Sequence, residues 1–467
     1  MSRAARSAGA GPARLLRSVD PCDGRLIASH STLDGPAVER RLARAVGAVG
    51  PWAERTPDER AALLGALADG LEERRDKLAL LVTSEMGKRL GEARAEVDKC
   101  AWACRYYAEH ASAWLADEPV ETAATASWVS YRPLGVLLAV MPWNFPLWQV
   151  FRCVAPALAA GNAIVLKHAS NVSLCALAID SLCRDSGLPP GVVQTLLIDS
   201  TRVEALVTDP RIAAVSVTGS EAAGRAVAAS AGRALKKCVL ELGGSDPFVV
   251  LDDADLDSAV TTAIAARFDN AGQSCIAAKR FIVVDQVADA FVERFADAAR
   301  DLHTGDPRDP ATALAPLART DLRDDLHTQV VDSVSAGARI VSGAQPLAGP
   351  GAYYPATVLD EVRTGMPVAE DEVFGPVAAV MRVSDERAAL ATANATRFGL
   401  GASVWTRDAA RGRAFAAALD CGAAFVNARV RSDPRLPFGG IKASGYGREL
   451  ARHGLREFTN AKTLWLD

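Results

Sequence analysis

Residues 270–280, NAGQSCIAAKR, place a cysteine among small and amide side chains, with two cations close behind it. Cys275 could be a nucleophile, because a thiolate adds readily to a carbonyl carbon, or it could be a small residue that fills a core. Its neighbours Asn270, Gln273 and Ser274 are poor strand formers and would bring polar groups into a core. The stretch alone does not decide between these interpretations, because a nucleophile also needs a base and a site for the oxyanion.

Polar groups that could meet these needs follow segments with the pattern of buried strands. In open α/β sheets, ligands bind outside the carboxyl ends of the strands, so groups at these ends should lie near one another. The segments are 135–141, 162–167, 213–217 and 237–242. The groups that they present are the amide of Asn144, the ammonium of Lys167, the turn Thr218-Gly219-Ser220 and the carboxylate of Glu241. Together they could hold a nucleotide and carry out proton chemistry.

Most of these groups also have a purely structural explanation. Asn144 could make a turn before Phe-Pro, and Lys167 could be a solvated strand end. Gly219-Ser220 fits ordinary helix capping, and no P-loop or G-x-G-x-x-G pattern is present. Glu241 is different, because a carboxylate within an apolar strand must be paired, protonated or functional.

The periodicity of the chain predicts the elements that would position these groups. Residues 36–115 have helical spacing and are rich in Ala, Leu, Glu and Arg. Residues 119–132 change to β-branched and aromatic residues, which predicts one or two strands outside the helical layer. From 135 to 242 strands and helices alternate, which is typical of a parallel sheet with crossover helices. The alternation resumes after residue 250 in a second α/β unit, and the last twenty residues look extended.

Length and composition restrict the class of protein. A chain of 467 residues is too long for one ordinary core and favours two or three domains. A net charge of -4 gives no reason to expect nucleic acid or a membrane surface as a partner. The nine cysteines show neither metal-ligand nor disulfide spacing, which favours reduced thiols, a cytoplasmic location and no metal site.

No apolar run in the sequence is suited to cross a bilayer. The longest, residues 153–166, is too short and is interrupted by Pro156, Gly161 and Asn162. The first eighteen residues carry four arginines and no acid, as an organelle transit segment would. They lack an amphipathic stripe, so we expect a disordered Ala/Arg tail instead.

Seven blocks of the sequence resemble the aldehyde dehydrogenase superfamily, over nearly the whole chain. They are MPWNFP, GNAIVLKHAS, VTGSEAAG, LELGGSDP, NAGQSC, EDEVFGPV and LPFGGIKASGYGRE. Within the superfamily the chain is most similar to the shorter bacterial succinate-semialdehyde dehydrogenases, through MPWNFPLWQVFR, LKHASN, CVLELGGSDPFVV, GQSCIAAKRF and SDPRLPFGG. The resemblance implies oxidation of an aldehyde to its acid with NAD(P), with succinate semialdehyde as the expected substrate.

The resemblance also implies catalytic roles. Cys275 would add to the aldehyde carbon, and the side-chain amide of Asn144 with the backbone N–H of Cys275 would form the oxyanion hole. Glu241 would activate the water that hydrolyses the thioester. Alternatives are a broad-specificity enzyme, a coenzyme A-acylating enzyme, a cysteine acyl-hydrolase without redox chemistry and a catalytically silent relative. Glu241 argues against the coenzyme A reaction, because a hydrolytic base is present.

For the cofactor, the resemblance implies contacts along the strand ends. Lys167 and Ser170 would contact the adenosine ribose, Ser220 would meet the pyrophosphate at a helix N-terminus, and Glu372 would hold the nicotinamide ribose. The other expected cofactor residues are Pro142, Trp143, Gly219, Gly224, Leu242 and Phe374. The family often reads Lys-Pro-x-Glu where this chain has a hydroxyl at position 170. A hydroxyl and an ammonium can accommodate a 2′-phosphate, so we expect NADP to be preferred over NAD.

For the substrate, Arg152 and Ser432 would bind the distal carboxylate, and Trp148 would line the channel. Arg152 comes eight residues after Asn144 on an expected helix; it could instead be a surface arginine. The stretch 426–431, VNARVR, differs from the glycine-containing version of close relatives, so the substrate mouth could differ as well.

The resemblance implies a Rossmann-like cofactor domain, an α/β catalytic domain and a small β oligomerisation arm. The expected boundaries are 1–118 and 133–242 for the cofactor domain, 243–440 for the catalytic domain, and 119–132 with 441–467 for the arm. An arm of this kind implies a homodimer or homotetramer.

Overall fold

The computed structural model describes residues 14–467. Of the expected N-terminal tail, residues 1–13 lie outside this range. The remainder is not disordered, because Leu15–Val19 (β1) pairs antiparallel with Leu26–Ser31 (β2). The expectation of a tail is therefore wrong for these residues. Leu16 and Ser18 are buried while their neighbours face solvent, which is the alternation of a strand with one buried face. The arginines of this segment made the alternation hard to recognise in the sequence.

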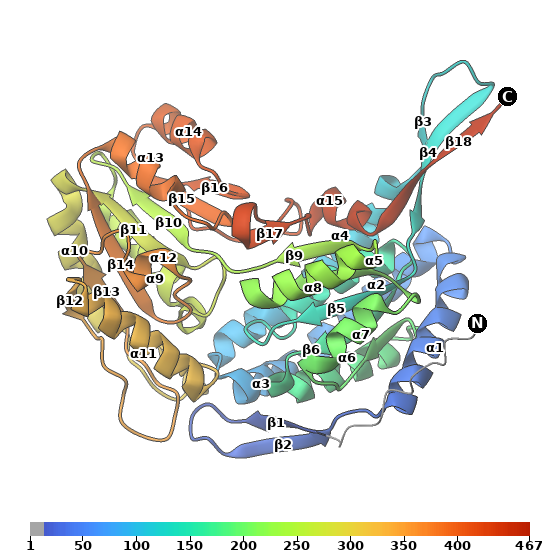
Figure 1. Ribbon diagram of the computed structural model, residues 1–467, viewed down its shortest axis with the longest axis horizontal. Coiled ribbons are helices and arrows are strands. Elements are labelled where there is room, and N and C mark those ends of the chain that lie inside the picture. The colour runs from blue at the N-terminus through green and yellow to red at the C-terminus, as the bar shows by residue number, and fades with distance from the viewer. Residues whose placement is uncertain (1–13) are drawn as a thin grey trace, which may run out of the picture.

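A six-stranded sheet forms one half of the molecule (Figure 1). Its parallel strands are β5 (Val136–Met141), β6 (Ala163–His168), β7 (Val193–Thr195), β8 (Ile212–Thr218) and β9 (Lys237–Glu241), and the short antiparallel β17 (Gly445–Tyr446) lies at one edge. The spatial order is β17-β9-β8-β5-β6-β7. The chain runs outward from β5 to β7 and then returns to add β8 and β9 on the other side. The switch point between β5 and β8 is where such sheets bind ligands.

Helices cover both faces of this sheet. One face packs against α2 (Pro57–Glu73), α3 (Arg75–Met86), α4 (Leu90–Leu115), α5 (Trp148–Ala159) and α6 (Ser173–Asp185). The other packs against α1 (Gly35–Ala53), α7 (Val203–Thr208) and α8 (Glu221–Arg233). Alternate residues of β6 explain this arrangement, because Ile164 and Leu166 face the first layer while Ala163 and Val165 face the second. The helices expected over 36–115 are confirmed as α1 to α4.

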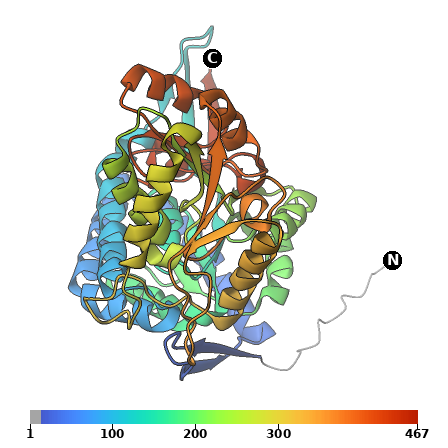
Figure 2. The same cartoon turned by 90° about the vertical axis from the view of Figure 1, so that its left-hand side faces the viewer.

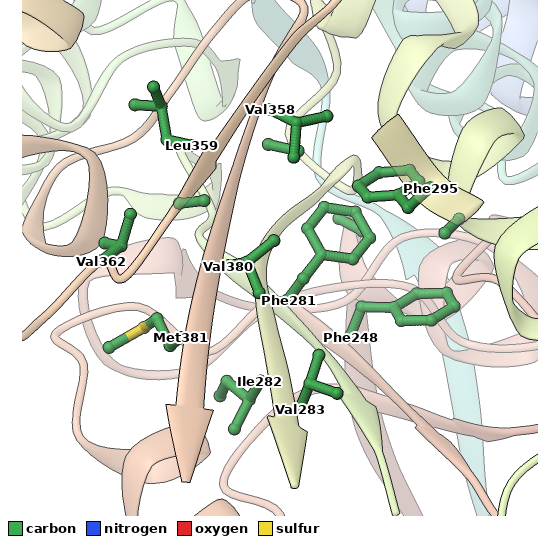
Figure 3. Packing of buried hydrophobic residues seen from close by; sticks show 14 of the residues in the cluster. Phe248, Phe281, Ile282, Val283, Phe295, Val358, Leu359, Val362, Val380 and Met381 are labelled. Carbon is green, nitrogen blue, oxygen red and sulfur yellow. The ribbon is translucent and has the colours of Figure 1, made fainter. Parts of the chain in front are cut away.

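A seven-stranded sheet forms the other half, which Figure 2 turns toward the viewer. Its order is β12 (Arg339–Ser342), β13 (Thr357–Asp360), β14 (Val377–Val383), β11 (Ala278–Val284), β10 (Asp246–Val250), β15 (Gly401–Trp405) and β16 (Ala423–Val426), and only β12 is antiparallel. Its helices are α9 (Leu256–Phe268), α10 (Asp285–Arg300), α11 (Thr320–Ser335), α12 (Pro367–Glu370), α13 (Glu386–Asn394) and α14 (Ala409–Ala418). Phe248, Phe281 and Phe295 pack together at its centre (Figure 3), with the rings of Phe281 and Phe295 4.8 Å apart.

A third, small sheet projects beyond the body of the molecule (Figure 1). It consists of β3 (Glu118–Pro119), β4 (Ala126–Pro133) and β18 (Thr459–Leu466), in the order β18-β4-β3. The segment 441–467 therefore reaches two sheets, because β17 pairs with β9 and β18 pairs with β4. The extended C-terminus is confirmed for β18 but is wrong for α15 (Ala451–Glu457), a short helix that buries Leu455 against the first helical layer.

In the part of the chain that the structure describes, none of the helices combines the length and the apolar character that a membrane crossing requires.

Candidate active site

The loop that carries Cys275 is held in place by two buried cations. It lies between η3 (Asp269–Gly272) and β11. Lys279 Nζ donates to the carbonyls of Ser274 and Cys275 at 2.9 and 2.7 Å. The guanidinium of Arg267, on α9, donates to the carbonyls of Gly272 and Ala278 at 2.6 and 2.9 Å. These charged donors tie the buried loop to α9 and β11, so the two cations fix the position of the nucleophile.

The same loop contains strained backbone. Asn270 and Ala271 both have left-handed φ values, of 54° and 52°, which are unfavourable for residues with a Cβ. The turn brings the cysteine out of its own α/β unit, because Cys275 and Ile276 pack against the hydrophobic cluster of the six-stranded half.

Asn144 follows β5 and is tied directly to this loop. Its side-chain Nδ2 donates to the backbone carbonyl of Gln273 at 3.0 Å, and its backbone carbonyl accepts from Asn270 Nδ2 at 2.9 Å. The side chain is buried, with 4% of its surface exposed. An amide group has two N–H donors, and the bond to Gln273 uses one of them. Asn144 can therefore offer its second N–H near the nucleophile.

The thiol of Cys275 is protonated at rest. Burial raises its pKa to about 12, although the charges of Arg152 and Lys279 act in the opposite direction. Because the thiolate is the reactive form, the site must supply a group that removes the proton.

Glu241, at the end of β9, is an unpaired carboxyl group in the interior. Only 2% of its surface is exposed, and within residues 14–467 neither of its oxygens has a hydrogen-bond partner. Burial raises its pKa, and Arg152 opposes this shift. Of the three interpretations that the sequence left open for this residue, hydrogen-bonded pairing is excluded. A buried carboxyl without a partner and with a raised pKa is suited to exchange protons.

Glu372 and two glycines join the two halves beside the nucleophile. Glu372 Oε1 accepts from the backbone N–H of Gly244 at 3.0 Å. A Cβ on Gly243 would lie 2.4 Å from Glu372 Oε2, and one on Gly244 would lie 2.6 Å from the carbonyl oxygen of Cys275. A side chain is thus excluded at position 244, where it would meet backbone, and at position 243 it would displace the end of the Glu372 side chain. The expected nicotinamide contact, Glu372, lies within this close-packed region.

Two further residues of the expected cofactor set lie together nearby. The rings of Trp143 and Phe374, from opposite halves of the molecule, meet edge to face with centroids 5.7 Å apart. Pro142 precedes Trp143 and is partly buried. They extend the region around Glu372 toward the end of β5.

The residues expected at the adenosine lie along the ends of β6 and β8. Lys167 is 9% exposed, and in the described range its ammonium makes no hydrogen bond or ion pair. Burial lowers its pKa. Ser170 is exposed at the start of η1 (Ser170–Val172). An unpaired ammonium beside an exposed hydroxyl suits an anionic ligand.

The turn after β8 has the capping role that the sequence allowed. Ser220 is the N-cap of α8, and its Oγ accepts from the N–H of Ala223 at 3.3 Å. A Cβ on Gly224 would lie 2.4 Å from the side chain of Leu242, so the glycine lets α8 pack closely on the sheet. Gly224 and Leu242 thus form one contact beside the ends of β8 and β9, and the backbone N–H of Gly219 donates to the carbonyl of Glu241 at 3.1 Å. The N-terminus of α8 faces the position where a pyrophosphate could bind.

These features fit a dinucleotide. A partner-free ammonium and a hydroxyl stand at one end, a helix N-terminus stands at the middle, and Glu372 with two aromatic rings stands at the other end.

In residues 14–467, no group of three or more His, Cys, Asp or Glu side chains is arranged to hold a metal ion. All nine cysteines are free thiols.

A cavity of about 280 Å³ reaches Cys275, and none of the expected cofactor residues is among those that line it. Trp148, Arg152 and Ser432 all line it, together with Lys99 of α4. Arg152 is only 1% exposed, so the alternative of a surface arginine is excluded. Its Nε forms an ion pair with Glu449, and its guanidinium lies 4.6 Å from the ring of Phe438. Its role toward a substrate carboxylate stays a prediction, since its charge already has a partner.

Sequence reasoning assigned no role to three cations of the site: Lys279, which it noted close behind Cys275, and Lys99 and Arg267, which it did not consider. Lys279 follows Cys275 by four residues, and that spacing was the available signal. Lys99 and Arg267 lie on helices whose patterns do not reveal that they face the site.

The family model described as "Aldehyde dehydrogenase family" matches residues 8–464. A succinate-semialdehyde dehydrogenase (NADP+) of Mycobacterium ulcerans is 49% identical over 97% of this chain and 99% of its own. A succinate semialdehyde dehydrogenase (NAD(P)+) of Escherichia coli is 48% identical over 98% and 99%. The crystal structure of a succinic semialdehyde dehydrogenase from Streptococcus pyogenes, in complex with NADP+, is 36% identical, with a TM-score of 0.95 over 97% of this chain and 99% of that one.

Proposed function

The chain belongs to the aldehyde dehydrogenase family, and from that membership we propose that it oxidises succinate semialdehyde to succinate, with NADP preferred over NAD. The protein is an NAD(P)-dependent aldehyde dehydrogenase. The proposal assigns its substrate, its cofactor preference and the roles of its residues.

The first chemical step takes place at Cys275. Its thiol gives its proton to Glu241, which releases it to solvent before the second step, and the sulfur adds to the aldehyde carbon to give a thiohemiacetal. The negative charge that develops on the former carbonyl oxygen is stabilised by the Nδ2 amide of Asn144 and the backbone N–H of Cys275. One such donor contributes about 3 kcal/mol to lowering the barrier. The bond from Asn144 to the carbonyl of Gln273 keeps the amide beside the nucleophile.

A nicotinamide held by Glu372, Trp143 and Phe374 would supply the hydride acceptor that the conversion of the thiohemiacetal into a thioester requires. Glu241 then removes a proton from water, the resulting hydroxide adds to the thioester carbon, and the carboxylic acid leaves while the thiol is restored. The raised pKa of Glu241 supports this role, because a stronger base accepts a proton from water more readily. The hydrolytic carboxyl also favours this reaction over transfer of the acyl group to a thiol such as coenzyme A.

For cofactor binding, we assign Lys167 and Ser170 to the adenosine ribose and its 2′-phosphate, and Ser220 to the pyrophosphate. Gly219, Gly224 and Leu242 shape the same wall, and Pro142, Trp143, Glu372 and Phe374 hold the nicotinamide end. The ammonium of Lys167 supports this assignment, because it is buried without a partner in the described range.

The observation that carries the substrate assignment is the cationic lining of the cavity that reaches Cys275. Five cations line it, against three carboxylates: the cations are Lys88, Lys99, Arg152, Arg429 and Arg431, and the carboxylates are Glu92, Glu96 and Asp269. A cavity for a neutral aldehyde does not need these charges, whereas the distal carboxylate of succinate semialdehyde does. We assign this carboxylate to the region of Arg152 and Ser432, with Trp148 as the channel wall.

The test compares succinate semialdehyde with butanal, which has the same number of carbons and no carboxylate. The rate of cofactor reduction with each aldehyde gives kcat/KM, with NADP and with NAD. We expect succinate semialdehyde to be favoured by at least about 30-fold, the effect of one good ion pair in a partly desolvated site. Equal efficiency, or a preference for butanal, would refute the substrate assignment.

Nine free thiols are in keeping with a cytoplasmic location, which we also propose.

We further propose a homodimer or homotetramer that assembles through the sheet β18-β4-β3. Strand β18 lies at the edge of its sheet and is mostly exposed, so its outer edge is open to a second chain. Light scattering coupled to size-exclusion chromatography measures the assembly, and a monomer at micromolar concentration would contradict it. The domain boundaries stated above are part of the same proposal.

A further inference from the structure

Lys99 is a half-buried lysine that points into the cavity beside Cys275. It lies on α4, far in sequence from the residues that it contacts. Its Nζ donates to Ser432 Oγ at 2.7 Å and lies 4.3 Å from the ring centroid of Trp148. Two of the residues assigned to the substrate therefore contact this one ammonium group. Lys99 itself has no role in the assignments made so far.

The other cations that line the cavity, apart from Arg431, already have carboxylate partners. Arg152 pairs with Glu449, Lys88 pairs with Glu96, and Arg429 pairs with Asp269. Within residues 14–467, no carboxylate lies within ion-pair distance of Lys99, and its two short contacts are a hydroxyl and an aromatic ring. Arg431 also makes no ion pair in this range, but it is exposed at the mouth. Lys99 is thus the inner cation whose charge is not balanced by a carboxylate.

The charged and titratable groups around Lys99 favour an incoming anion. Burial and the positive charge of Arg152 lower the pKa of Lys99 to about 8, while Glu96, Cys100 and Asp433 act weakly in the opposite direction. The ammonium is therefore protonated at neutral pH but poorly compensated. A substrate carboxylate would supply the missing negative charge in a site where water screens the interaction little.

The hydrogen bond between Lys99 and Ser432 also orients the serine. The ammonium donates to Ser432 Oγ, so the hydroxyl hydrogen of Ser432 must point to another acceptor. Lys99 keeps two further N–H donors, and the face of Trp148 supports its charge from one side. One lysine and one serine can therefore donate to the two oxygens of a single carboxylate.

We propose that Lys99 is the specificity-determining cation of this enzyme: with Ser432, it binds the carboxylate at the end of the substrate opposite the reacting aldehyde. Arg152, held by Glu449, then contributes its charge to the same region while its position is fixed. This inference rests on the proposed function, because it requires a substrate that carries a distal carboxylate.

The test replaces Lys99 by Met, which keeps the length of the side chain, and by Gln, which keeps a hydrogen-bond donor for Ser432. Each variant is assayed with succinate semialdehyde and with butanal at saturating NADP. For both variants we expect kcat/KM for succinate semialdehyde to fall by about 30-fold or more, mainly through KM. The value for butanal should change by less than about threefold, and it shows at the same time that the variant is folded.

A matched control is Arg105→Met, which removes another cation from α4. Arg105 pairs with Asp69 and Glu72 on the outer side of the helix, away from the cavity. We expect this variant to keep its preference between the two aldehydes.

Three outcomes separate the inference from the proposed function. If the unmodified enzyme favours succinate semialdehyde and both Lys99 variants lose that preference, the inference is supported. If the unmodified enzyme favours it and either Lys99 variant keeps that preference, through equal losses or through none, the inference is overturned while the proposed function stands. If the unmodified enzyme does not favour succinate semialdehyde, the proposed function fails, and the inference fails with it.

Discussion

Cys275 and Glu241 are both held in their protonated forms by burial. Burial raises the pKa of the thiol to about 12, and it also raises the pKa of the Glu241 carboxyl. Arg152 lowers both pKa values, but not enough to offset desolvation. A protonated thiol is a weak nucleophile and is also slow to be oxidised. The site therefore keeps its nucleophile unreactive until a proton is removed in the presence of substrate.

The raised pKa of Glu241 predicts how turnover depends on pH. A general base works only when it is deprotonated, so kcat should rise with pH through a value above the usual range of a glutamate. As pH falls through that pKa, turnover should be lost. In Glu241→Gln, kcat should fall by about 100-fold or more, and this limb of the profile should disappear. The pH profile of kcat with saturating substrate measures both effects. If kcat of the variant still rises with pH over the same range, a group other than Glu241 causes that rise.

Position 170 predicts the choice of cofactor. Ser170→Glu would place a carboxylate beside the adenosine ribose, where it accepts hydrogen bonds from the ribose hydroxyls and repels a 2′-phosphate. We expect the ratio of kcat/KM for NADP to that for NAD to fall by about tenfold or more, since one repulsive charge contact typically costs more than 1.4 kcal/mol. The unmodified protein should use NADP better. If it strongly prefers NAD, contacts other than position 170 determine the cofactor.

Part of the site could be predicted from the sequence, because its residues follow apolar strands. Asn144, Lys167, Ser220 and Glu241 lie at or just after the ends of strands in the structure, as the sequence indicated. Lys99 could not be predicted in this way. Its contact with Ser432 spans 333 residues of sequence and depends on how two halves of the molecule pack.

At the level of secondary structure, the regular alternation of strands and helices could be predicted from the sequence. Short elements that are stabilised by distant contacts could not be predicted. The strands expected at 135–141, 162–167, 213–217 and 237–242 are found as β5, β6, β8 and β9 within one residue, whereas β7 and α7 were not predicted. The hairpin of β1 and β2 and the helix α15 were missed. Both are short, and the apolar residues of β1 and α15 become buried only against helices far away in the chain. Local periodicity does not contain that information.

The close packing of Gly243 against Glu372 gives a prediction about how these elements meet. A Cβ at position 243 would lie 2.4 Å from Glu372 Oε2, at the flexible end of that side chain. In Gly243→Ala, Glu372 should therefore move away while the backbone stays in place. We expect KM for the cofactor to rise about tenfold, the effect of losing one hydrogen bond to a charged group. The melting temperature should change by only a few degrees.

Gly232→Ala is the matched control for this substitution, because a Cβ at Gly232 would meet no atom within 4 Å. A large loss of stability in Gly243→Ala with an unchanged cofactor KM would contradict the assignment of Glu372 to the nicotinamide ribose.

For the molecule as a whole, the site exists only where the two α/β halves meet. The cysteine loop belongs to the seven-stranded half but packs on the core of the other, and Glu241 and Asn144 follow strands of the six-stranded sheet. Most of the residues that we assign to the dinucleotide follow strands of that sheet, and the cavity that we assign to the substrate reaches the sulfur of Cys275. The proposed cofactor and substrate sites are therefore separate sets of residues that share one nucleophile.

The most direct test of this account is to trap the acyl group in the Glu241→Gln variant. Without the base, thioester hydrolysis is blocked, whereas the Cys275 thiol can still ionise slowly at raised pH. We incubate the variant with saturating succinate semialdehyde and NADP at about pH 8, which is above neutrality but close enough to the pKa of Lys99 that a large share of its ammonium keeps its charge, and record the mass of the intact protein and of its peptides. The control is the same variant with Cys275→Ala.

The account predicts one succinyl group on the peptide that contains Cys275, an equal amount of reduced cofactor, and no adduct in the control. Succinylation at another residue, an adduct that persists without Cys275, or normal steady turnover in Glu241→Gln would contradict it.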